Sequence, residues 1–407
     1  MRPLHRVVIT GIGAVTPLGL NATDTWSALR EGRVAIGPLE SFPREGLRYG
    51  IAAEVRGFDP AAHFDDKKLV QYDRFTQFAL VAAREAIKQA GIDFAADGLG
   101  EDTAVIIGTG VGGEQTHDEA SRRLYGDNNP RLHPLTIVRL ITNAATSHIC
   151  IEHGLNGPAF ATSSACASAN HALAQAFAMV RSGMVGAAVA GGSEACITRG
   201  VVRAWEAMRV MADDTCRPFS KQRRGMVLGE GAGVFVLETL ESAQRRGATI
   251  LAELAGAGMS ADASDIVFPS QVGAARAITR ALADARLAPE DIDYINAHGT
   301  ATPANDPTET KAIRQVFGAH ADQLMVSSTK SMHGHALGAA GAIELVATIG
   351  ALRDGVVPPT MNFIDPDPEC DLDYVPNAAR ERPVRAALSN SLAFGGLNAV
   401  LALRPAP

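Results

Sequence analysis

The sequence has few cysteines and no long apolar run. No segment reaches the roughly 20 uninterrupted apolar residues of a membrane span, and residues 1–6 lead into the short apolar segment Val7–Thr10 without the features of a secretory signal. The cysteines are odd in number and never form a C-x-x-C pair, which argues against a disulfide framework or a zinc site. They are Cys150, Cys166, Cys196, Cys216 and Cys370. We therefore expect a cytoplasmic protein with no membrane span.

Positive charge is also scarce. The formal net charge is -7 at pH 7, and no long block of Lys and Arg occurs. Because neutralisation of phosphates needs clustered cations, nucleic acid is a poor candidate partner. An acidic protein partner needs only a local basic patch, and Lys67–Lys68 and Arg217–Arg224 could provide one. Ordinary solvated surface charge is the alternative for each.

Short β-branched runs alternate with helical patterns along the chain. Apolar residues between Phe75 and Ala90 recur at i, i+3, i+4 and i+7, which predicts a helix packed on a sheet. The alternation predicts an α/β fold with layered helices and mostly parallel strands. The predicted strands are Val7–Gly11, Ala104–Gly108, Ala188–Gly191, Val234–Leu237, Tyr294–Ala297 and Met325–Ser328.

The chain also resembles itself. Residues 82–109 pass from an Ala-rich helix through an acidic turn to a strand and a Gly-Thr loop, and residues 277–300 do the same. Val8–Gly13 likewise resembles Glu253–Gly258. We therefore predict two duplicated halves, 1–250 and 251–407. Chance similarity between α/β units is the alternative, because there are only two copies.

Cys166 lies where a small-residue segment gives way to the Ala-rich helical pattern Ala172–Val180. At a helix N-terminus, unpaired backbone N–H groups and the helix dipole favour the thiolate, which is the nucleophilic form of cysteine. A buried, unreactive cysteine fits this segment equally well.

Two further segments place polar groups after predicted strands. His298 directly follows a strand, and the carboxyl ends of strands in an α/β sheet line the ligand crevice. Lys330, His335 and Glu344 occur in an otherwise apolar segment that joins another strand to a Gly/Ala-rich helix. A structural role is the alternative for a lone histidine.

Other patterns carry weaker signals. Gly108–Gly113 matches G-x-G-x-x-G, but Glu114 follows where a pyrophosphate would need helix N–H groups, so we predict a tight loop and no dinucleotide. His333 and His335 have no carboxylate or thiol at a supporting spacing, so we predict no metal. The glycine pair within Leu388–Asn398 could aim backbone N–H groups at an oxyanion, or could form only a hairpin.

Four motifs occur in order: Ser164–Cys166, Asn296–Thr300, Lys330–Gly341, and Asn390 with Phe394–Gly396. Together they resemble the β-ketoacyl-acyl-carrier-protein synthases, most closely the elongating 3-oxoacyl-ACP synthase II type. The resemblance covers essentially the whole chain. It implies the thiolase fold, with two duplicated βαβαβαβ halves in an αβαβα sandwich, and a homodimer.

The resemblance implies a decarboxylating Claisen condensation of an acyl-enzyme with malonyl-ACP, as in fatty acid elongation, and no cofactor other than the phosphopantetheine carried by the acyl carrier protein (ACP). Cys166 would accept the acyl group, and the backbone N–H groups of Cys166 and Phe394 would stabilise the oxyanion. His298 and His335 would hydrogen-bond the malonyl thioester oxygen as enolate charge develops. Lys330 completes the implied catalytic set.

The resemblance also implies supporting roles. Glu344, with Lys330, would fix the orientation and charge of the histidines. Thr300 and Thr302 match positions that bind the phosphopantetheine arm. Val111 and Leu392 match positions that shape the acyl pocket, and Phe394 matches a gate beside the cysteine.

Lys67 and Arg209 match basic positions that dock the carrier protein, whereas Val70 and Gln71 replace two residues that are commonly basic. Together with Ala393 in the gating turn, these departures are compatible with a ketosynthase of a specialised pathway, of the nodulation-factor or aryl-polyene type. A non-catalytic chain-length-factor partner is a further alternative, although that class lacks the cysteine nucleophile.

Overall fold

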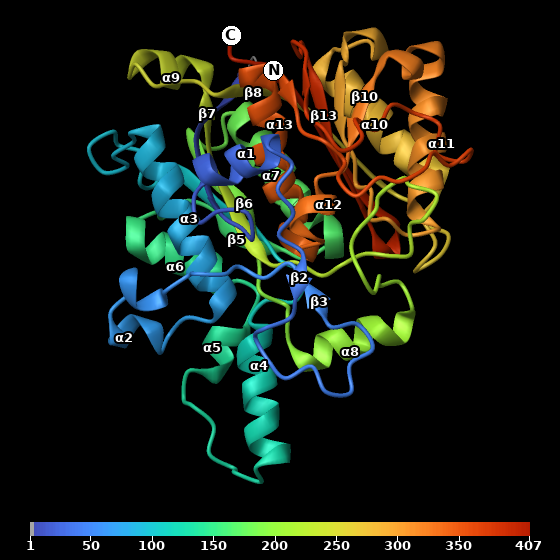
Figure 1. Ribbon diagram of the computed structural model, residues 1–407. Helices are drawn as coiled ribbons and strands as arrows, with labels where there is room; N and C mark the ends of the chain where they lie inside the picture. Colours follow the sequence, from blue (N-terminus) through green and yellow to red (C-terminus); the bar gives the residue numbers. More distant parts are fainter. Residues whose placement is uncertain (1–3) are drawn as a thin grey trace.

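The computed structural model describes residues 4–407. Residues 1–3, which belong to the segment inspected above for a secretory signal, lie outside the described residues. A ten-stranded mixed sheet has the order β10-β9-β13-β14-β8-β1-β7-β6-β4-β5 (Figure 1). Its strands are β1 Val7–Val15, β4 Thr103–Gly108, β5 Ala159–Thr162, β6 Ala187–Glu194, β7 Gly231–Thr239, β8 Ala252–Ala261, β9 Tyr294–Asn296, β10 Met325–Ser327, β13 Ala387–Ala393 and β14 Leu397–Pro405. The six predicted strands are confirmed.

The sheet consists of two parts with equal numbers of strands. β1 pairs with β8 at the centre, and five strands lie on each side of this junction. Residue 250 lies between α9 (Leu240–Arg245) and β8, so the N-terminal residues supply β1-β7-β6-β4-β5 and the C-terminal residues supply the rest. We refer to these two parts as the N-terminal half and the C-terminal half.

The expectation of mostly parallel strands is wrong. Four neighbouring pairs of the sheet are parallel and five are antiparallel. The parallel pairs occur where helices connect the strands, as parallel pairing requires a crossover. β13 and β14 are instead joined by the three-residue turn Phe394–Gly396, which leaves only antiparallel pairing possible. The segment therefore forms a hairpin, which leaves the Phe394 N–H of its turn available to an oxyanion.

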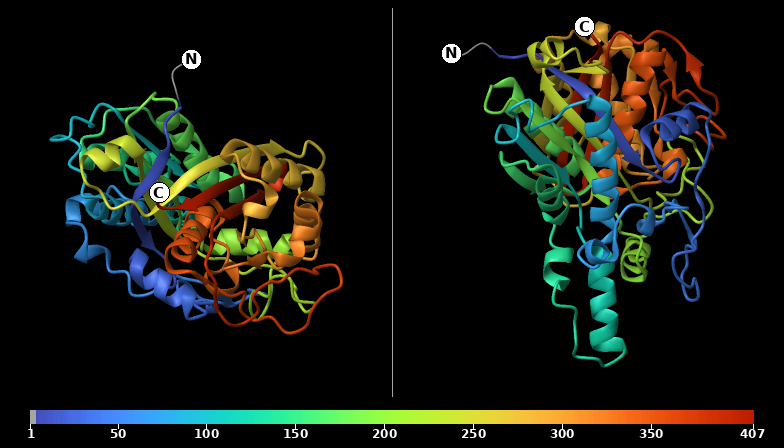
Figure 2. Two further views of the ribbon diagram at one scale, coloured as in Figure 1. Left: turned by 90° about the horizontal axis from the view of Figure 1, so that it is seen from above. Right: turned by 90° about the vertical axis from the view of Figure 1, so that its left-hand side faces the viewer.

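Helices pack against both faces of the sheet (Figures 1 and 2). They are α1 Ala22–Arg30, α2 Asp66–Leu69, α3 Arg74–Ala90, α4 Glu114–Ser121, α5 Thr136–Leu140, α6 Ala144–His153, α7 Ser168–Arg181, α8 Arg199–Met208, α10 Gln271–Ala285, α11 Asn305–Phe317, α12 Lys330–His333 and α13 Ala340–Asp354. The predicted helix between Phe75 and Ala90 is confirmed as α3. No helix within residues 4–407 is long and apolar enough to cross a membrane.

Glycines explain the repeated motif in β1 and β8. α3 packs so closely on β1 that a Cβ atom at Gly13 would lie 1.9 Å from the carbonyl oxygen of Ala82. α10 packs on β8 in the same way, and a Cβ atom at Gly258 would lie 2.1 Å from the carbonyl oxygen of Ala277. Only glycine permits this approach of strand and helix, so the two halves share the same packing solution.

α7 and α13 bring the halves together. α7 contacts β4 and β6 of the N-terminal half as well as β8 and β14 of the C-terminal half, and it also packs on α13. Cys166 directly precedes α7, and Lys330–Gly338 precedes α13. The two buried helices therefore deliver the predicted nucleophile and the predicted histidine segment to one region.

Candidate active site

A strained turn presents Cys166 at the start of α7. Ala165 has a φ of +48°, a left-handed conformation that is unfavourable for a residue with a side chain. The hydroxyl of Ser168 holds this turn, because it accepts a hydrogen bond from the Ser164 backbone N–H (2.9 Å) and donates one to the Ala165 carbonyl (2.7 Å). Cys166 thus lies in the short 3-10 turn Ala165–Ala167 that leads into α7, as predicted.

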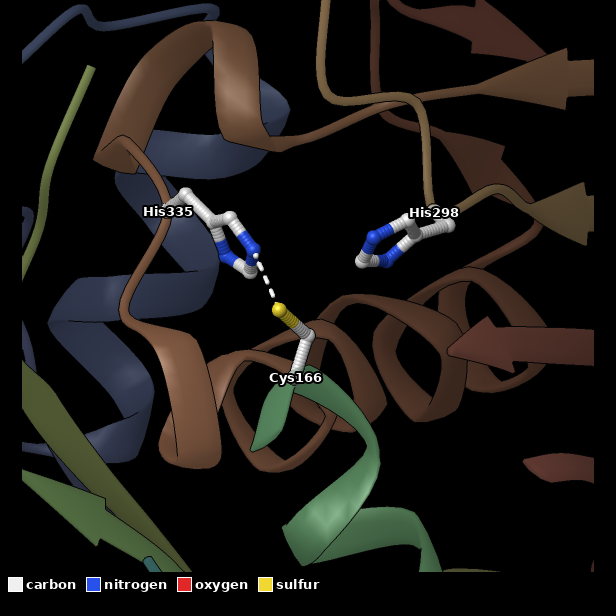
Figure 3. A group of neighbouring side chains, drawn as sticks. All are labelled: Cys166, His298 and His335. Carbon is white, nitrogen blue, oxygen red and sulfur yellow. Dashed lines mark hydrogen bonds between the residues drawn. The ribbon is translucent and has the colours of Figure 1, made fainter. Parts of the chain in front are cut away.

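Cys166, His298 and His335 converge from three parts of the chain (Figure 3). Their sulfur and ring nitrogen atoms lie within 4.8 Å of one another, and His335 Nε2 is 3.1 Å from Cys166 Sγ. The two imidazole rings are nearly perpendicular, with centroids 5.4 Å apart. All three side chains are buried. His333, considered above with His335 as a metal ligand, is not part of this group and contacts Thr329 Oγ1.

The prediction of a stabilised thiolate is wrong for the resting protein. Burial raises the pKa of the Cys166 thiol to about 11. The charge of Lys330 and the backbone N–H groups of Phe394 and Cys166 lower this pKa, but by less than burial raises it. The helix N-terminus does not compensate for the loss of water, so Cys166 is a thiol that gives up its proton as it reacts.

Both histidines are neutral. Burial lowers the pKa of His298 and of His335 well below its usual value, and the positive charge of Lys330 lowers both further. A neutral imidazole has one N–H donor and one nitrogen acceptor. The two rings can therefore each donate a hydrogen bond to an oxygen atom in the cavity without carrying a charge themselves.

Lys330 lies behind His298. Its Nζ donates to the His298 carbonyl oxygen (2.6 Å), lies 3.4 Å from His298 Nδ1, and forms an ion pair with Glu344. The side chains of Lys330 and Glu344 are fully buried and line no part of the cavity at Cys166. Lys330 thus contacts His298, whereas neither Lys330 nor Glu344 contacts the Cys166 thiol.

A second buried carboxylate fixes the backbone at His298. Glu309, on α11, accepts hydrogen bonds from the backbone N–H groups of His298 (2.9 Å) and Gly299 (2.8 Å). Asn390 Nδ2 donates to the same carboxylate (3.1 Å). Glu309 was not among the predicted residues, because the start of α11 is polar and its sequence does not distinguish a buried glutamate from an exposed one.

A cavity of about 250 Å³ leads to Cys166. Its residues include the predicted Thr300, Thr302 and Leu392, and the two threonine hydroxyls are 3.0 Å apart. Trp205 also lines this cavity, and no sequence pattern predicted that position. The cavity residues are Cys166, Trp205, Met208, Val210, Met226, Val267, Phe268, Pro269, His298, Thr300, Thr302, Pro303, Ala304, Asn305, His335, Leu392, Ala393 and Phe394.

Val111 is not among these residues. Its loop is held by Glu194, which accepts hydrogen bonds from the Gly110 and Val111 backbone N–H groups (2.6 and 3.3 Å) and from the Gly338 N–H (2.9 Å). A carboxylate thus occupies the N–H groups that a dinucleotide phosphate would need, which supports the prediction of a tight loop. The Val111 side chain is 41% exposed.

The two predicted docking residues are far apart. Lys67 lies on α2, whereas Arg209 ends α8, and Figure 1 shows these helices on opposite sides of α4. Arg209 adjoins Met208 of the Cys166 cavity. It also lines a second cavity of about 430 Å³ that contains Arg48 and Arg224.

Comparisons with known proteins agree with this geometry. The family model described as Beta-ketoacyl synthase, N-terminal domain, matches residues 4–243, and the corresponding C-terminal domain model matches residues 251–364. The chain is 50% identical over 404 residues to a nodulation protein E of Rhizobium sp. (strain N33), covering 98% of this chain and 99% of the relative. It is 43% identical over 406 residues to a 3-oxoacyl-[acyl-carrier-protein] synthase 2 of Staphylococcus aureus (strain N315), covering 98% of each.

A solved structure has the same fold. It contains a type II polyketide synthase acyl-carrier protein in complex with its ketosynthase, and the matched chain is 32% identical with a TM-score of 0.91, covering 99% of this chain and 100% of the other. The fold is therefore the predicted thiolase fold. Because the family models and the relatives span nearly all of the sequence, the chain belongs to the β-ketoacyl synthase family, whose members are condensing enzymes of the acyltransferase type.

Proposed function

We propose that this condensing enzyme joins an acyl group on Cys166 to malonyl-ACP with loss of CO2 and releases 3-oxoacyl-ACP. One observation carries the proposal: a buried thiol lies within 4.8 Å of two histidine nitrogens, and burial together with Lys330 keeps both histidines neutral. A thiol can hold an acyl group, and two neutral donors can stabilise an enolate oxygen without a metal or a redox cofactor.

In the first step, Cys166 attacks the thioester carbon of acyl-ACP. The Cys166 S–C bond forms, the bond from carbon to the phosphopantetheine sulfur breaks, and the thiol proton passes to the leaving sulfur. The N–H groups of Cys166 and Phe394 would hold the oxyanion of the tetrahedral intermediate, since both already approach the sulfur.

In the second step, malonyl-ACP occupies the same cavity. The bond to the malonyl carboxylate breaks, CO2 leaves, and its electron pair forms an enolate whose oxygen accepts hydrogen bonds from His298 and His335. The carbanion then attacks the acyl-Cys166 carbonyl, and the Cys166 sulfur leaves as a thiolate that takes up a proton from solvent. Lys330 contacts His298, and its positive charge helps burial to keep that histidine neutral, while Glu344 holds Lys330 in place. Thr300 and Thr302 would bind the phosphopantetheine arm along the cavity wall.

The proposed partner is an acyl carrier protein. The polyketide ketosynthase described above is bound to its own carrier, and the cavity next to Cys166 adjoins a cluster of three arginines, Arg48, Arg209 and Arg224. Arg224 pairs with Asp213 at 3.6 Å. Replacement of Arg209 with Glu should raise the KM for acyl-ACP about tenfold. Acylation by a free acyl-pantetheine thioester should not change, because it needs no protein docking. Lys67 would contact a different part of the carrier.

A homodimer would cover the exposed edge of the sheet. β5 is an edge strand, and Phe160 on it is 38% exposed. Ile151 on α6 is 75% exposed beside it. Exposed edge strands are normally covered, and pairing of β5 with its copy would also place the partner near Val111, where it could close the acyl pocket. A Phe160→Lys variant should be monomeric by light scattering.

We also propose a cytoplasmic location, as all five cysteines are unpaired.

The relatives of this chain point to two pathways. The relation to 3-oxoacyl-ACP synthase 2 supports fatty acid elongation, whereas the higher identity to nodulation protein E favours a specialised lipid pathway as a second candidate. Intact-mass measurement after exposure to acyl-ACPs of different length and unsaturation separates them. Preferential loading of saturated chains supports elongation, and preferential loading of polyunsaturated or otherwise unusual chains supports the specialised pathway.

The reaction is tested by separating its two steps. Cys166→Ala should form no acyl-enzyme while it keeps the fold, as measured by intact mass spectrometry and thermal unfolding. His298→Ala should lose malonyl decarboxylation more than acylation of Cys166. An unchanged condensation rate in the Cys166 variant, or equal retention of both steps in the His298 variant, would contradict the proposed mechanism.

A further inference from the structure

Trp205 and Phe394 form a stacked pair beside the nucleophile. Their ring centroids are 5.7 Å apart and their planes are inclined by 23°. Trp205 lies on α8 of the N-terminal half, whereas Phe394 begins the turn between β13 and β14 of the C-terminal half. Both line the cavity that contains Cys166. The stack thus joins α8 to the turn that borders the reacting sulfur.

Phe394 contributes to the site with its backbone and with its side chain. Its backbone N–H is close enough to the Cys166 thiol to lower the pKa of that thiol, and its side chain lines the cavity. The two residues that follow are Gly395 and Gly396, with φ of +80° and +67°. A Cβ atom at Gly395 would meet nothing closer than Ile266 Cδ1 at 3.8 Å, so there is room beside the residue that follows Phe394, whereas Gly396 packs against Asp262. Glycines give this turn little stiffness of its own.

Contacts from outside restrain the turn. The Gly395 N–H donates to the Ile266 carbonyl oxygen (2.8 Å), and the Gly396 carbonyl oxygen accepts from the Asp262 N–H (2.9 Å), so both glycines are held through their backbone. The stack on Trp205 holds the Phe394 ring. Trp205 itself is only partly buried and packs on the outside of the apolar cluster that includes Cys166. Loss of its side chain therefore removes a restraint on Phe394 without opening the protein core.

We propose that Trp205 is a positioning residue that holds Phe394 beside Cys166 and thereby sets the length of the acyl group that Cys166 accepts. The inference rests on the proposed function. An offset aromatic stack fixes the ring in one orientation, which keeps the Phe394 N–H close to the sulfur. A short acyl group fits beside the fixed ring, whereas a long one has to displace it, because the cavity of about 250 Å³ also admits the phosphopantetheine arm.

The test is single-turnover acylation of Cys166 by the hexanoyl and palmitoyl thioesters of a bacterial ACP, followed by intact mass spectrometry. Trp205→Ala should slow hexanoyl transfer about tenfold, because the oxyanion donor is no longer held. The palmitoyl-to-hexanoyl rate ratio should rise by about fivefold, because the ring moves aside more easily. Trp205→Phe, which can still stack, should restore both quantities to within about twofold of the original enzyme.

Val201→Ala is the matched control. Val201 lies on the same helix and packs on the same apolar cluster as Trp205 but does not line the cavity, so this variant removes an apolar contact of α8 without removing the stack. It should keep the original chain-length ratio, and thermal unfolding should show that all three variants are folded. An unchanged ratio in Trp205→Ala, or the same shift in Val201→Ala, would overturn the inference. If the unmodified protein is not acylated by either thioester, the proposed function fails instead.

The fluorescence of Trp205 reports on the stack itself, and a purely structural role of Trp205 would not make its emission depend on acylation of Cys166. The sequence has two tryptophans, so a Trp26→Phe background leaves Trp205 as the only one. Trp26 lies away from the cavity, where its indole N–H donates to Asp354. Palmitoylation of Cys166 should change the Trp205 emission spectrum as the stack opens, and the Cys166→Ala variant should show no change. An emission spectrum that stays the same on palmitoylation would contradict the inference.

Discussion

In the N-terminal half the chain passes from β5 into α7 through the turn Ala165–Ala167, and in the C-terminal half it passes from β10 towards α13 through the turn Leu337–Ala339. The first residue of each turn has a positive φ, +48° and +42° respectively. The second residue is Cys166 in the N-terminal turn and Gly338 in the C-terminal turn. The two halves therefore make two similar turns, and only the N-terminal turn carries a side chain at its second position.

The neighbours of the two turns explain this difference. The Cys166 side chain points towards the histidines (Figure 3). A Cβ atom at Gly338 would lie 2.2 Å from the Gly110 nitrogen and 2.7 Å from Glu194 Oε2. The loop after β4 thus occupies the space that a second nucleophile would need. The turn of the N-terminal half therefore has space for a reactive side chain, whereas the turn of the C-terminal half is filled by close packing between the halves.

The largest expected effect comes from exchanging the two positions. Cys166→Gly should fold and lose acylation completely, since the nucleophile is gone. Gly338→Cys should destabilise the protein by about 3 kcal/mol, because backbone atoms have to move to make room. Chemical denaturation measures the loss, and intact mass spectrometry should show that the double variant is not acylated at residue 338. A stable, acylated double variant would mean that the two turns are equivalent after all.

The loops that follow β4 and β9 provide a second comparison. A buried carboxylate holds each loop by accepting backbone N–H groups: Glu194 holds Gly110 and Val111, and Glu309 holds His298 and Gly299. Only the second loop carries a histidine of the candidate site. The same kind of restraint therefore supports packing in one half and places a functional side chain in the other.

Replacement of each glutamate with glutamine should separate these roles. Each change puts an NH2 group against backbone donors and should cost about 1–3 kcal/mol of unfolding free energy. Glu309→Gln should also reduce malonyl decarboxylation about tenfold or more, because His298 is displaced. Glu194→Gln should reduce decarboxylation less than that. Equal losses of decarboxylation in variants of equal stability would mean that Glu309 has no particular effect on His298.

Local patterns predicted most of the framework. The periodicity that predicts α3 and the repeated glycines of β1 and β8 depend on neighbours in sequence. The ordered motifs around Cys166, His298 and His335 also identified the residues that the fold brings together. Three features escaped prediction because they depend on tertiary contacts: the antiparallel pairs at the centre of the sheet, the stack of Trp205 on Phe394, and the sign of the Cys166 pKa shift. Burial at the site outweighs the helix N-terminus, and the sequence does not specify that balance.

The cysteine of the N-terminal half and the histidines of the C-terminal half should also differ in their response to pH. Burial raises the pKa of Cys166 to about 11, so its thiolate fraction should rise about tenfold per pH unit between pH 7 and 9. Alkylation of Cys166 by iodoacetamide, followed by peptide mass spectrometry, measures this rise. His298 and His335 have pKa values well below the usual one, so both stay neutral above pH 6.5 and take up a proton only in more acidic solution.

Malonyl decarboxylation should therefore change by less than about twofold between pH 6.5 and 8.5. It is best measured in Cys166→Ala, where acylation does not contribute to the observed rate. A decarboxylation rate that falls severalfold as the pH drops from 8.5 to 6.5 would show that a histidine gains its proton in this range. The positive charge of Lys330 would then not be sufficient to keep the C-terminal half of the site neutral.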